Sequence, residues 1–511
     1  MWLGPLPTQL DRQHRPMRPE IMAIDTTLIV TPAEMGAIDK AASDSGLDSF
    51  ALMRAAGAHV AALFLAEYPG AMRAIVLCGP GNNGGDGHVA AKLLMQSSMN
   101  VVRYGMKPKS GGDAAKAHAD CPGTILPLKD WEPRCGDVII DALFGAGLDR
   151  PVSAEVSVVI DLARDASVPV IAVDLPSGLS GRTGASTGSC FSAAHTATFA
   201  ALKPGHLLMP GRALCGNTHL CDIGIPARLI VSKERLWRNH PGLYAHQLPS
   251  TDASGHKYSR GHLVVFSGPL ISGGAARLAA MAGLQTGAGL VTMASPPSAV
   301  MVQATHLTAL MQRSIGTADD LAEWLKDNRL AGFVIGPGFG DLEKVRFYTQ
   351  QLAQTGRPVV LDADGLTAFA PDVDELAHLF SGDTRLIITP HEGEFRRLFP
   401  DLADNGELSK IDRARNAASL LNAVVIDKGP DTVIAAPDGR CAINADAPPW
   451  LATAGSGDVL SGIVGSLGVQ GMAPFEAACA GVALHSQAGV RAGEGMSSED
   501  LVRQIRGYSP D

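Results

Sequence analysis

The sequence has no excess of basic residues, few aromatic residues and no long apolar run. Its 42 Lys and Arg are outnumbered by 51 Asp and Glu, so the formal net charge of −9 gives no support to general binding of nucleic acid or acidic membranes. No uninterrupted apolar stretch approaches the roughly 20 residues that cross a bilayer. Residues 1–19 contain Arg and Pro but not the apolar core of a signal peptide. We therefore expect a cytoplasmic protein with small-molecule partners, no nucleic acid and no membrane.

The eight cysteines also lack a pattern. None lies in a C-x-x-C pair or at the spacing of a zinc site, so we expect reduced and mostly buried thiols. The chain of 511 residues is too long for one ordinary core, which predicts roughly two to four domains.

Short apolar runs alternate with helical patterns in both halves of the chain, which is typical of parallel α/β sheets. Residues 1–26 are expected to be a disordered extension, or the result of a start site upstream of the true one. The other expected parts are a first domain over 27–235, a polar linker over 236–256 and a second domain over 257–511. No repeat relates the halves, so we expect two unrelated domains that work independently.

A Gly-rich run, Cys78–Gly87, follows the apolar stretch 74–77 and precedes a helical pattern from His88. Backbone N–H groups at a strand-to-helix turn suit a pyrophosphate. The run contains G-x-G-x-x-G, but no acid ends the next strand, 101–105, so an ordinary dehydrogenase is disfavoured. Two amides and a carboxylate in the run, Asn82, Asn83 and Asp86, add hydrogen-bonding groups. The run predicts a dinucleotide-related site.

Two further polar loops follow predicted strands of the first half. Asp141 follows 138–140, and Asp174 to Gly178 follows 170–173. Because the carboxyl ends of parallel strands meet at one edge of a sheet, these loops and the Gly-rich run are expected to face one crevice. Asn83, Asp141 and Ser177 together offer oxygens whose low charge suits a monovalent cation.

These motifs, with the segment Phe199–Gly205 (F-A-A-L-K-P-G), resemble the NAD(P)H-hydrate (NAD(P)HX) epimerase family over about residues 31–226. The resemblance implies a Rossmann-like three-layer αβα fold, a potassium ion on Asn83, Asp141 and Ser177, and an acid–base role for Asp141. Whether one carboxylate does both stays open. The residues implied to contact the hydrated dinucleotide are Asn82, Asn83, Gly84, Gly85, Asp86, Gly145, Ala146, Gly147, Leu148, Asp149, Arg150, Pro151 and Asp174.

A second Gly-rich run, Thr453–Gly462, marks a helix start in the second half. Its N–H groups suit an anion, and a carboxylate beside them, Asp458, can orient or deprotonate an attacking hydroxyl. A helix cap alone would explain Asp458 but not Gly455, Gly457 and Gly462 together.

Other polar loops of the second half follow predicted strands. His391 stands beside two glutamates, but no second histidine lies at ligand spacing, so a ligand contact is favoured over a metal site. Asp362 and Asp364 fit a magnesium site and a turn equally well.

The ordered set G-P-G-x-G, D-A-D-G-L, T-P-H-x-G-E, K-G-x-x-T and G-S-G-D-V-L is similar to the NAD(P)HX dehydratase family of the ribokinase-like superfamily, over about residues 257–504. The resemblance implies a ribokinase-like α/β fold, ADP or ATP with magnesium, and Asp458 as the catalytic residue. The implied hydrate contacts are Ala275, Gly338, His391 and Asp458. The implied nucleotide contacts are Lys428, Gly429, Pro430, Asp431, Thr432 and Gly457.

The two resemblances predict successive repair steps on NADHX and NADPHX: epimerisation of the R and S hydrates, then nucleotide-dependent dehydration of the S form. One alternative is a vitamin kinase whose first half is a regulatory dinucleotide-binding domain. Another is a binding-only scaffold, which the retained Asp141 and N-N-G-G-D run disfavour. The choice between ADP and ATP, and a homo-oligomer, stay open.

Overall fold

The computed structural model describes residues 27–148, 150–186, 188–249, 257–370 and 372–506. The predicted extension over 1–26 lies outside these residues, as do 250–256 of the predicted linker and Asp149 of the predicted site.

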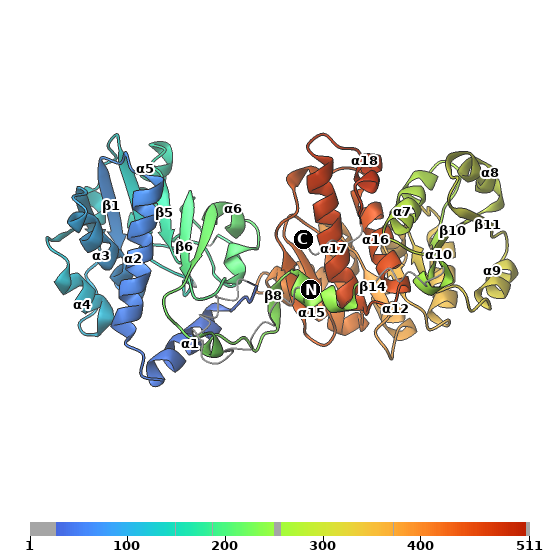
Figure 1. The fold of residues 1–511 in the computed structure, drawn as a ribbon, viewed down its shortest axis with the longest axis horizontal. Coiled ribbons are helices and arrows are strands. Elements are labelled where there is room, and N and C mark those ends of the chain that lie inside the picture. Colours follow the sequence, from blue (N-terminus) through green and yellow to red (C-terminus); the bar gives the residue numbers. More distant parts are fainter. Residues whose placement is uncertain (1–26, 149, 187, 250–256, 371, 507–511) are drawn as a thin grey trace, which may run out of the picture.

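The first half is a seven-stranded parallel sheet in the order β3-β2-β1-β4-β5-β6-β7 (Figure 1). Its strands are β1 Arg73–Cys78, β2 Val101–Gly105, β3 Ile125–Leu126, β4 Asp137–Ala142, β5 Val170–Val173, β6 His195–Phe199 and β7 Asn217–Cys221. Its helices are α1 Pro32–Asp44, α2 Ser49–Glu67, α3 Asn82–Gln96, α4 Gly112–Asp120, α5 Ala154–Asp165 and α6 Gly211–Cys215.

Alternating strand residues cover the two faces of this sheet. Val76, Ile140 and their neighbours pack against α2 and α3, whereas Ile75 and Ile139 pack against α5. Successive strand side chains point to opposite faces, so continuous apolar runs produce a sheet buried on both sides. The predicted three-layer αβα fold is confirmed.

The second half is a ten-stranded sheet in the order β11-β10-β9-β12-β13-β14-β15-β16-β17-β8. Its strands are β8 Leu236–Arg238, β9 His262–Phe266, β10 Leu290–Ser295, β11 Met311–Ser314, β12 Gly332–Ile335, β13 Val359–Leu361, β14 Leu386–Ile388, β15 Val424–Asp427, β16 Thr432–Ala435 and β17 Cys441–Asn444. The strands run parallel except for β16, which is antiparallel to both of its neighbours.

Helices cover both faces of the second sheet as well. Helices α7, α16 and α17 pack on one face, and α10, α12, α13 and α15 pack on the other. The helices of this half are α7 Gly273–Gln285, α8 Pro297–His306, α9 Ala318–Leu325, α10 Leu342–Ala353, α11 Asp364–Thr367, α12 Val373–Leu379, α13 Glu392–Leu398, α14 Pro400–Ala403, α15 Lys410–Leu421, α16 Ser456–Val469, α17 Pro474–Ala492 and α18 Ser498–Arg503. The predicted α/β class holds here too.

The prediction of a polar linker over residues 236–256 needs correction, because the first part of this segment belongs to the second half. β8 pairs with β17, placing Leu236 opposite Cys441 and Trp237 opposite Ala442. Tyr244 is buried in the core on the α17 side of the sheet. Apolar side chains therefore fix residues 236–248 against the second half, and a three-residue strand is too short to show a pattern in the sequence.

The two halves lie side by side with β8 between them (Figure 1). Ile29 donates its N–H to the carbonyl of Leu236 at 3.2 Å, and its side chain joins a core cluster that continues through the second half. Leu207 and Leu208 of the first half belong to the same cluster. The halves therefore share buried apolar surface, in contrast to the expected separation by a polar linker.

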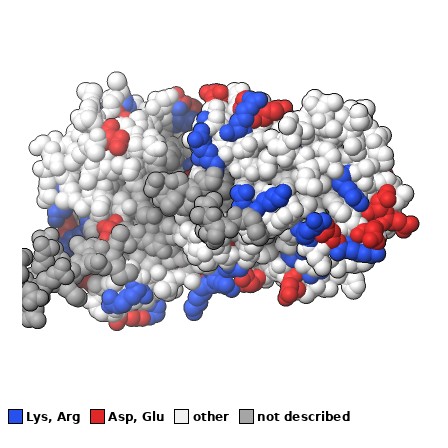
Figure 2. Space-filling model, turned by 45° about the vertical axis from the view of Figure 1, so that its right-hand side comes forward, with Lys and Arg blue, Asp and Glu red and all other residues white. Residues whose placement is uncertain are grey.

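Helix α2 is long and apolar enough to cross a membrane by length and composition alone. Its Ala56, Val60 and Phe64 pack against the first sheet, as in the core helix of a folded domain. On the face shown in Figure 2, acidic and basic side chains lie interspersed between large uncharged areas.

We predict that Leu208→Ala lowers the free energy of unfolding by about 2–5 kcal/mol, because it leaves a cavity in the core that the halves share. Leu208 is almost fully buried. Calorimetry should show one lowered transition that includes both halves. Leu420→Ala, at a leucine that is 48% exposed, is the matched control and should change stability by less than about 0.5 kcal/mol. Two separate transitions, of which only one shifts, would contradict a shared core.

Candidate functional site

The first Gly-rich run joins the carboxyl end of β1 to α3. Helix α3 begins at Asn82, so N-N-G-G-D forms its first turns, earlier than the helical pattern from His88. The first N–H groups of a helix have no intrahelical partners, and here no side chain caps them either. This is the arrangement expected for an anion site.

Two glycines of the run are required by close packing within the protein. A Cβ on Gly79 would lie 1.8 Å from the carbonyl oxygen of Leu143, and one on Gly84 would lie 2.0 Å from that of Gly79. Gly79 lets the loop after β1 touch the loop after β4, and Gly84 lets the first turn of α3 pack against Gly79 in the same run. Gly79 therefore brings two polar loops together, and Gly84 keeps the Gly-rich run compact at the start of α3.

A cavity of about 910 Å³ opens where the loops after β1, β4 and β5 meet. This volume is within the range of small-molecule sites. Of the predicted contacts, Asn82, Asn83, Asp86, Gly145, Ala146, Gly147, Leu148, Arg150, Pro151 and Asp174 line it. Gly84 and Gly85 are buried behind the lining. The cavity also includes Asp39 of α1, which lies in none of the motifs, and Lys203, to which the F-A-A-L-K-P-G motif assigned no role.

Asp141 and Ser177 form a buried pair beside this cavity. The Ser177 hydroxyl donates to Oδ1 of Asp141 at 2.7 Å, and the Ser177 N–H donates to Oδ2 at 2.7 Å. The Leu143 N–H also donates to Oδ1, at 3.2 Å. Burial raises the pKa of Asp141 to about 6, although these hydrogen bonds act in the opposite direction.

The third predicted cation ligand, Asn83, lies at the cavity. Its Nδ2 atom is buried without a hydrogen-bond partner among the described residues. Its Oδ1 lies near Gly145, as does Oδ2 of Asp174. An unsatisfied buried amide beside neutral and singly charged oxygens fits a bound monovalent cation, because turning the amide presents its oxygen.

Asp174 projects from the loop after β5 and is fixed on both oxygens. Lys203 Nζ donates to Oδ1 at 2.8 Å, and the Ala146 N–H donates to Oδ2 at 2.8 Å. Burial alone would raise the pKa of Asp174, but the Lys203 ammonium outweighs it and lowers the pKa to about 2. Asp174 is therefore a carboxylate at neutral pH.

Two other acids of the cavity behave in the opposite way. Burial raises the pKa of Asp86 well above its usual range, and the negative charges of Asp174 and Asp39 add to this effect. Burial also raises the pKa of Asp39. One cavity thus combines a carboxylate that Lys203 keeps charged with two acids whose pKa values are raised.

The second site is built from loops at the carboxyl ends of β12, β13, β14 and β15 and from the start of α16. Asp362 accepts hydrogen bonds from Lys428 Nζ, at 2.9 Å, and from the Ser461 hydroxyl. Glu394 Oε2 lies 3.9 Å from the same ammonium. A Cβ on Gly457 would lie 3.1 Å from it, so Lys428 stands at the first turn of α16.

Asp458 is half-buried in this first turn. Burial raises its pKa to about 7, with help from the negative charges of Asp362 and Glu394, while the Lys428 ammonium opposes the shift. A carboxyl group that titrates near neutral pH at a helix N-terminus is suited to accept a proton from a substrate hydroxyl.

The remaining predicted hydrate contacts lie on the loop after β12, at the start of α7 and on the loop after β14. Gly338 accepts a hydrogen bond from the Ser272 hydroxyl, and the Cβ of Ala275 on α7 lies close to Gly338. His391 caps α13 by accepting the N–H groups of Gly393 and Glu394, and its side chain is 56% exposed. The Lys428 N–H donates to the carbonyl of Pro390, which brings the two loops together.

The predicted nucleotide loop, residues 428–432, contacts the first half. Asp431 accepts the Met209 N–H at 2.8 Å and Lys410 Nζ at 2.7 Å, so its carboxylate is occupied. Arg212 donates to the carbonyl of Pro430 at 3.0 Å. Thr432 closes the turn through hydrogen bonds with Gly429. Lys428 and Gly457 are thus the members of the predicted set whose groups meet at α16.

Asp362 and Asp364, which fit a magnesium site or a turn equally well in the sequence, are engaged separately. Asp362 pairs with Lys428, whereas Asp364 Oδ2 accepts the Gly340 N–H at 2.8 Å. Among the described residues, no group of three or more His, Cys, Asp or Glu side chains could hold a metal ion. The turn-forming role is favoured for Asp364.

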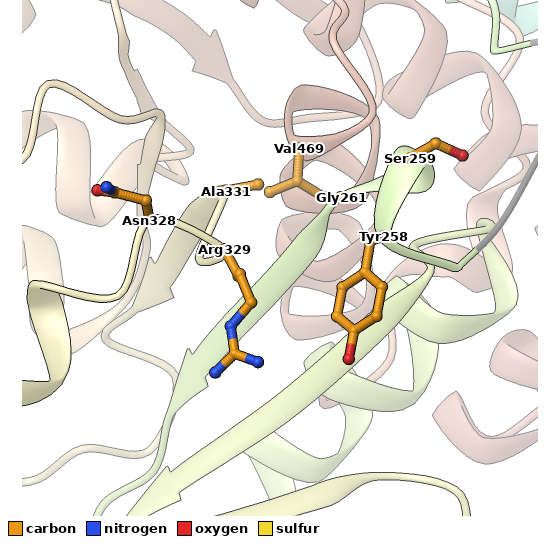
Figure 3. Close-up of a pocket in the computed structure, with 7 residues that line it drawn as sticks. All are labelled: Tyr258, Ser259, Gly261, Asn328, Arg329, Ala331 and Val469. Carbon is orange, nitrogen blue, oxygen red and sulfur yellow. The ribbon is translucent and has the colours of Figure 1, made fainter.

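A further cavity of about 520 Å³ lies at the opposite edge of the second sheet. Figure 3 shows its lining, which includes Tyr258, Gly261, Arg329, Ala331 and Val469. Gly261 and Ala331 precede β9 and β12, so this cavity is at the amino ends of the strands, away from the polar loops.

Comparison with known proteins matches both halves. Residues 49–205 match the family model of the YjeF-related protein N-terminus, and residues 263–509 match that of NAD(P)H-hydrate dehydratase. The bifunctional NAD(P)H-hydrate repair enzyme of Moorella thermoacetica is 36% identical over 90% of this chain and 92% of its own length. The enzyme of the same name from Escherichia coli is 34% identical over 88% and 86%.

A solved structure is also similar to part of the chain. It is the ADP/ATP-dependent NAD(P)H-hydrate dehydratase of Bacillus subtilis co-crystallised with ATP and Mg²⁺, at 26% identity and a TM-score of 0.43 over 50% of this chain and 92% of that chain.

We predict that Gly84→Ala lowers the free energy of unfolding by about 1–3 kcal/mol, because the new methyl group cannot fit beside the Gly79 carbonyl. Gly81→Ala, in the same loop, is the matched control. Nothing lies within 4 Å of a Cβ there, so stability should change by less than about 0.5 kcal/mol. Denaturant titration of both variants measures the difference, and equal stabilities would contradict the packing role of Gly84.

Proposed function

The chain belongs to the family of bifunctional NAD(P)H-hydrate repair enzymes, and we propose that its first half epimerises the R and S hydrates of NADH and NADPH. The second half then dehydrates the S form with an adenine nucleotide, ADP or ATP accompanied by magnesium. The observation that carries this proposal is the 36% identity over 90% of the chain with a repair enzyme, which includes both sites.

The experiment that tests it uses a mixture of R and S hydrates. Without nucleotide the protein should only interconvert the two forms, and with ADP or ATP the whole mixture should return to NADH. Family membership favours this reaction over the alternative of a vitamin kinase. Turnover of a vitamin alcohol with no effect on the hydrates would restore that alternative.

For the first half, we propose that the hydrate binds in the cavity between the loops after β1, β4 and β5. The N–H groups at the start of α3 suit its pyrophosphate. Asn83, Asp141 and Ser177 would hold potassium, whose positive charge would stabilise nearby oxygens of the substrate. The sequence implies an acid–base role for Asp141 as well. Full burial and hydrogen bonds on both of its oxygens fix this carboxylate away from the cavity, which fits a fixed ligand of the cation better than a group that exchanges a proton with the substrate.

For the second half, the N–H groups at the start of α16 and the Lys428 ammonium suit the nucleotide phosphates. Asp458 takes the proton from the substrate hydroxyl, whose oxygen then accepts the phosphoryl group. The phosphate leaves with the C–O electron pair, and loss of a neighbouring proton restores the ring double bond. The products are NAD(P)H, inorganic phosphate and AMP or ADP.

We predict that dehydration of the S hydrate speeds up as pH rises through about 7, because a base acts in its deprotonated form and the pKa of Asp458 is raised to about 7. Asp458→Asn should lower kcat by roughly 10²- to 10⁴-fold and remove this pH dependence. Recovery of NADH at saturating ADP measures both effects, and calorimetry should show nucleotide binding retained.

Asp500→Asn is the control for this variant. Asp500 is also a first-turn acid, on α18, and its loss weakens a helix cap outside the turn that carries Asp458. It should affect stability alone. If Asp458→Asn behaves in the same way, Asp458 serves only as a helix cap.

We predict that Asp141→Ala abolishes epimerisation and leaves nucleotide-dependent dehydration of the S hydrate nearly intact, because the two sites are separate. Potassium should raise the melting temperature of the wild-type chain but not of this variant. At 100 times the dissociation constant, a bound ion adds about 2.7 kcal/mol of stability. Asp165→Ala, at an exposed acid of α5, should keep the potassium response. Normal epimerisation by Asp141→Ala would remove Asp141 from the site.

A further inference from the structure

Lys203 belongs to the F-A-A-L-K-P-G motif of the first half. The sequence assigns no role to this lysine. Its side chain is 2% exposed and lines the cavity. Nζ donates to Asp174 Oδ1 at 2.8 Å, to Thr198 Oγ1 at 2.9 Å and to the carbonyl of Phe199 at 3.2 Å. An ammonium group has three hydrogens, so each has an acceptor and the group is fixed in direction.

This lysine fixes Asp174 in turn. Oδ1 also accepts the Thr198 hydroxyl at 3.0 Å, and Oδ2 accepts the Ala146 N–H. His206 Nε2 lies 2.8 Å from the backbone carbonyl of Asp174. Both oxygens and the backbone are thus held, and the carboxylate has one orientation beside the cavity.

Asp86 lines the same cavity from the start of α3. The structure shows no hydrogen bond to its carboxyl group within the described residues. The charged groups that act on it are Asp174 and Asp39 of α1, and the same cavity is also lined by Lys203, Asp113 and Arg150. Two carboxyl groups in one cavity, only one of which has a lysine, will differ in their affinity for a proton.

The chemistry of epimerisation, which rests on the function proposed above, needs such a difference. Acid-catalysed hydration places the hydroxyl on the carbon bonded to the ring nitrogen, and the R and S forms differ at this carbon. To invert it, one of its bonds must break and form again from the opposite face. Cleavage of the C–O bond needs a proton on the oxygen and a negative charge beside the cation that results.

We propose that Asp86 and Asp174 are the catalytic residues of the epimerase half, with Asp86 as the proton donor and Asp174 as the fixed anion, and that Lys203 is the positioning residue of Asp174. Asp86 gives its proton to the hydroxyl, and the C–O bond breaks with its electron pair leaving on water. The nitrogen lone pair forms a C=N bond, and Asp174 stabilises the cation. Water then adds to the opposite face, the C=N electron pair returns to nitrogen, and the Asp86 carboxylate regains a proton.

Asp141 is less suited to this step. It is fully buried and absent from the cavity lining, and Ser177 and Leu143 occupy its two oxygens. It holds the loop after β5 in place, and the proton is moved by groups that reach the cavity.

Asp86→Asn is the first test. It should lower kcat for epimerisation by roughly 10²- to 10⁴-fold with little change in KM, because the acid is lost and the shape is kept. Dehydration of the S hydrate by the same chain is the internal control for folding and should be unchanged. A raised KM with normal kcat would mean that Asp86 only binds substrate and would overturn its catalytic role.

The pH profile tests Lys203. Wild-type epimerisation should decline as pH rises and Asp86 loses its proton. In Lys203→Met, Asp174 loses its cation, its pKa rises, and activity should also be lost at the acidic end of the profile. Lys203→Arg keeps the charge and should restore the acidic end. A uniform loss in both variants, without any change in profile, would make Lys203 a structural residue only.

An isotope measurement on the wild-type chain shows which bond breaks during epimerisation. It needs no variant, so it remains informative even if a variant fails to fold. In ¹⁸O-labelled water, each inversion should introduce one labelled oxygen into the hydrate, after correction for exchange without protein. Inversion with retention of the original oxygen would overturn the C–O step. A wild-type chain that does not interconvert the hydrates at all would instead overturn the proposed function.

Discussion

A buried lysine–carboxylate pair at the carboxyl ends of parallel strands organises each half of the molecule. Lys203 and Asp174 are 2.8 Å apart in the first half, and Lys428 and Asp362 are 2.9 Å apart in the second. A buried charge without a partner would lose its proton or gain one, and removing one partner of such a pair typically costs about 3–5 kcal/mol. The polar loops of both sites are arranged around these two fixed carboxylates.

Each fixed carboxylate raises the pKa of the acid beside it. The negative charge of Asp174 helps burial to raise the pKa of Asp86, and that of Asp362 helps burial to raise the pKa of Asp458 to about 7. The lysine keeps one carboxyl group charged, and this negative charge increases the proton affinity of the neighbouring carboxyl group. The same arrangement of a lysine, a fixed carboxylate and an acid of raised pKa thus occurs in both halves.

The sequence predicts the sheets and the loops that carry polar residues, because apolar β-branched runs and Gly-rich turns are local patterns. It places the start of α3 too late. The helix begins at Asn82, but four glycines between 79 and 85, which have low helix propensity, make this region resemble a loop. It misses β8, which three residues form by pairing with a strand some 200 positions away. Asp39 and Lys203 follow no spacing rule, and their place at the cavity depends on how α1 and the loop after β6 pack. The raised pKa of Asp86 depends on those same long-range distances, since Asp174 and Asp39 contribute to it.

The segment 203–212 also connects the two sites through covalent and hydrogen bonds. Its first residue holds Asp174, while Met209 and Arg212 bind the loop 428–432 through Asp431 and the Pro430 carbonyl. The carboxylate that the motif assigns to the nucleotide is therefore used at the contact between the halves. A second half cut out at residue 235 would keep its sheet but lose the Met209 and Arg212 donors to this loop. It would also expose apolar surface that Ile29, Leu207 and Leu208 now cover. The fusion of the two halves is thus part of what shapes the second site, because the first half supplies hydrogen bonds to the loop on which the nucleotide is proposed to bind.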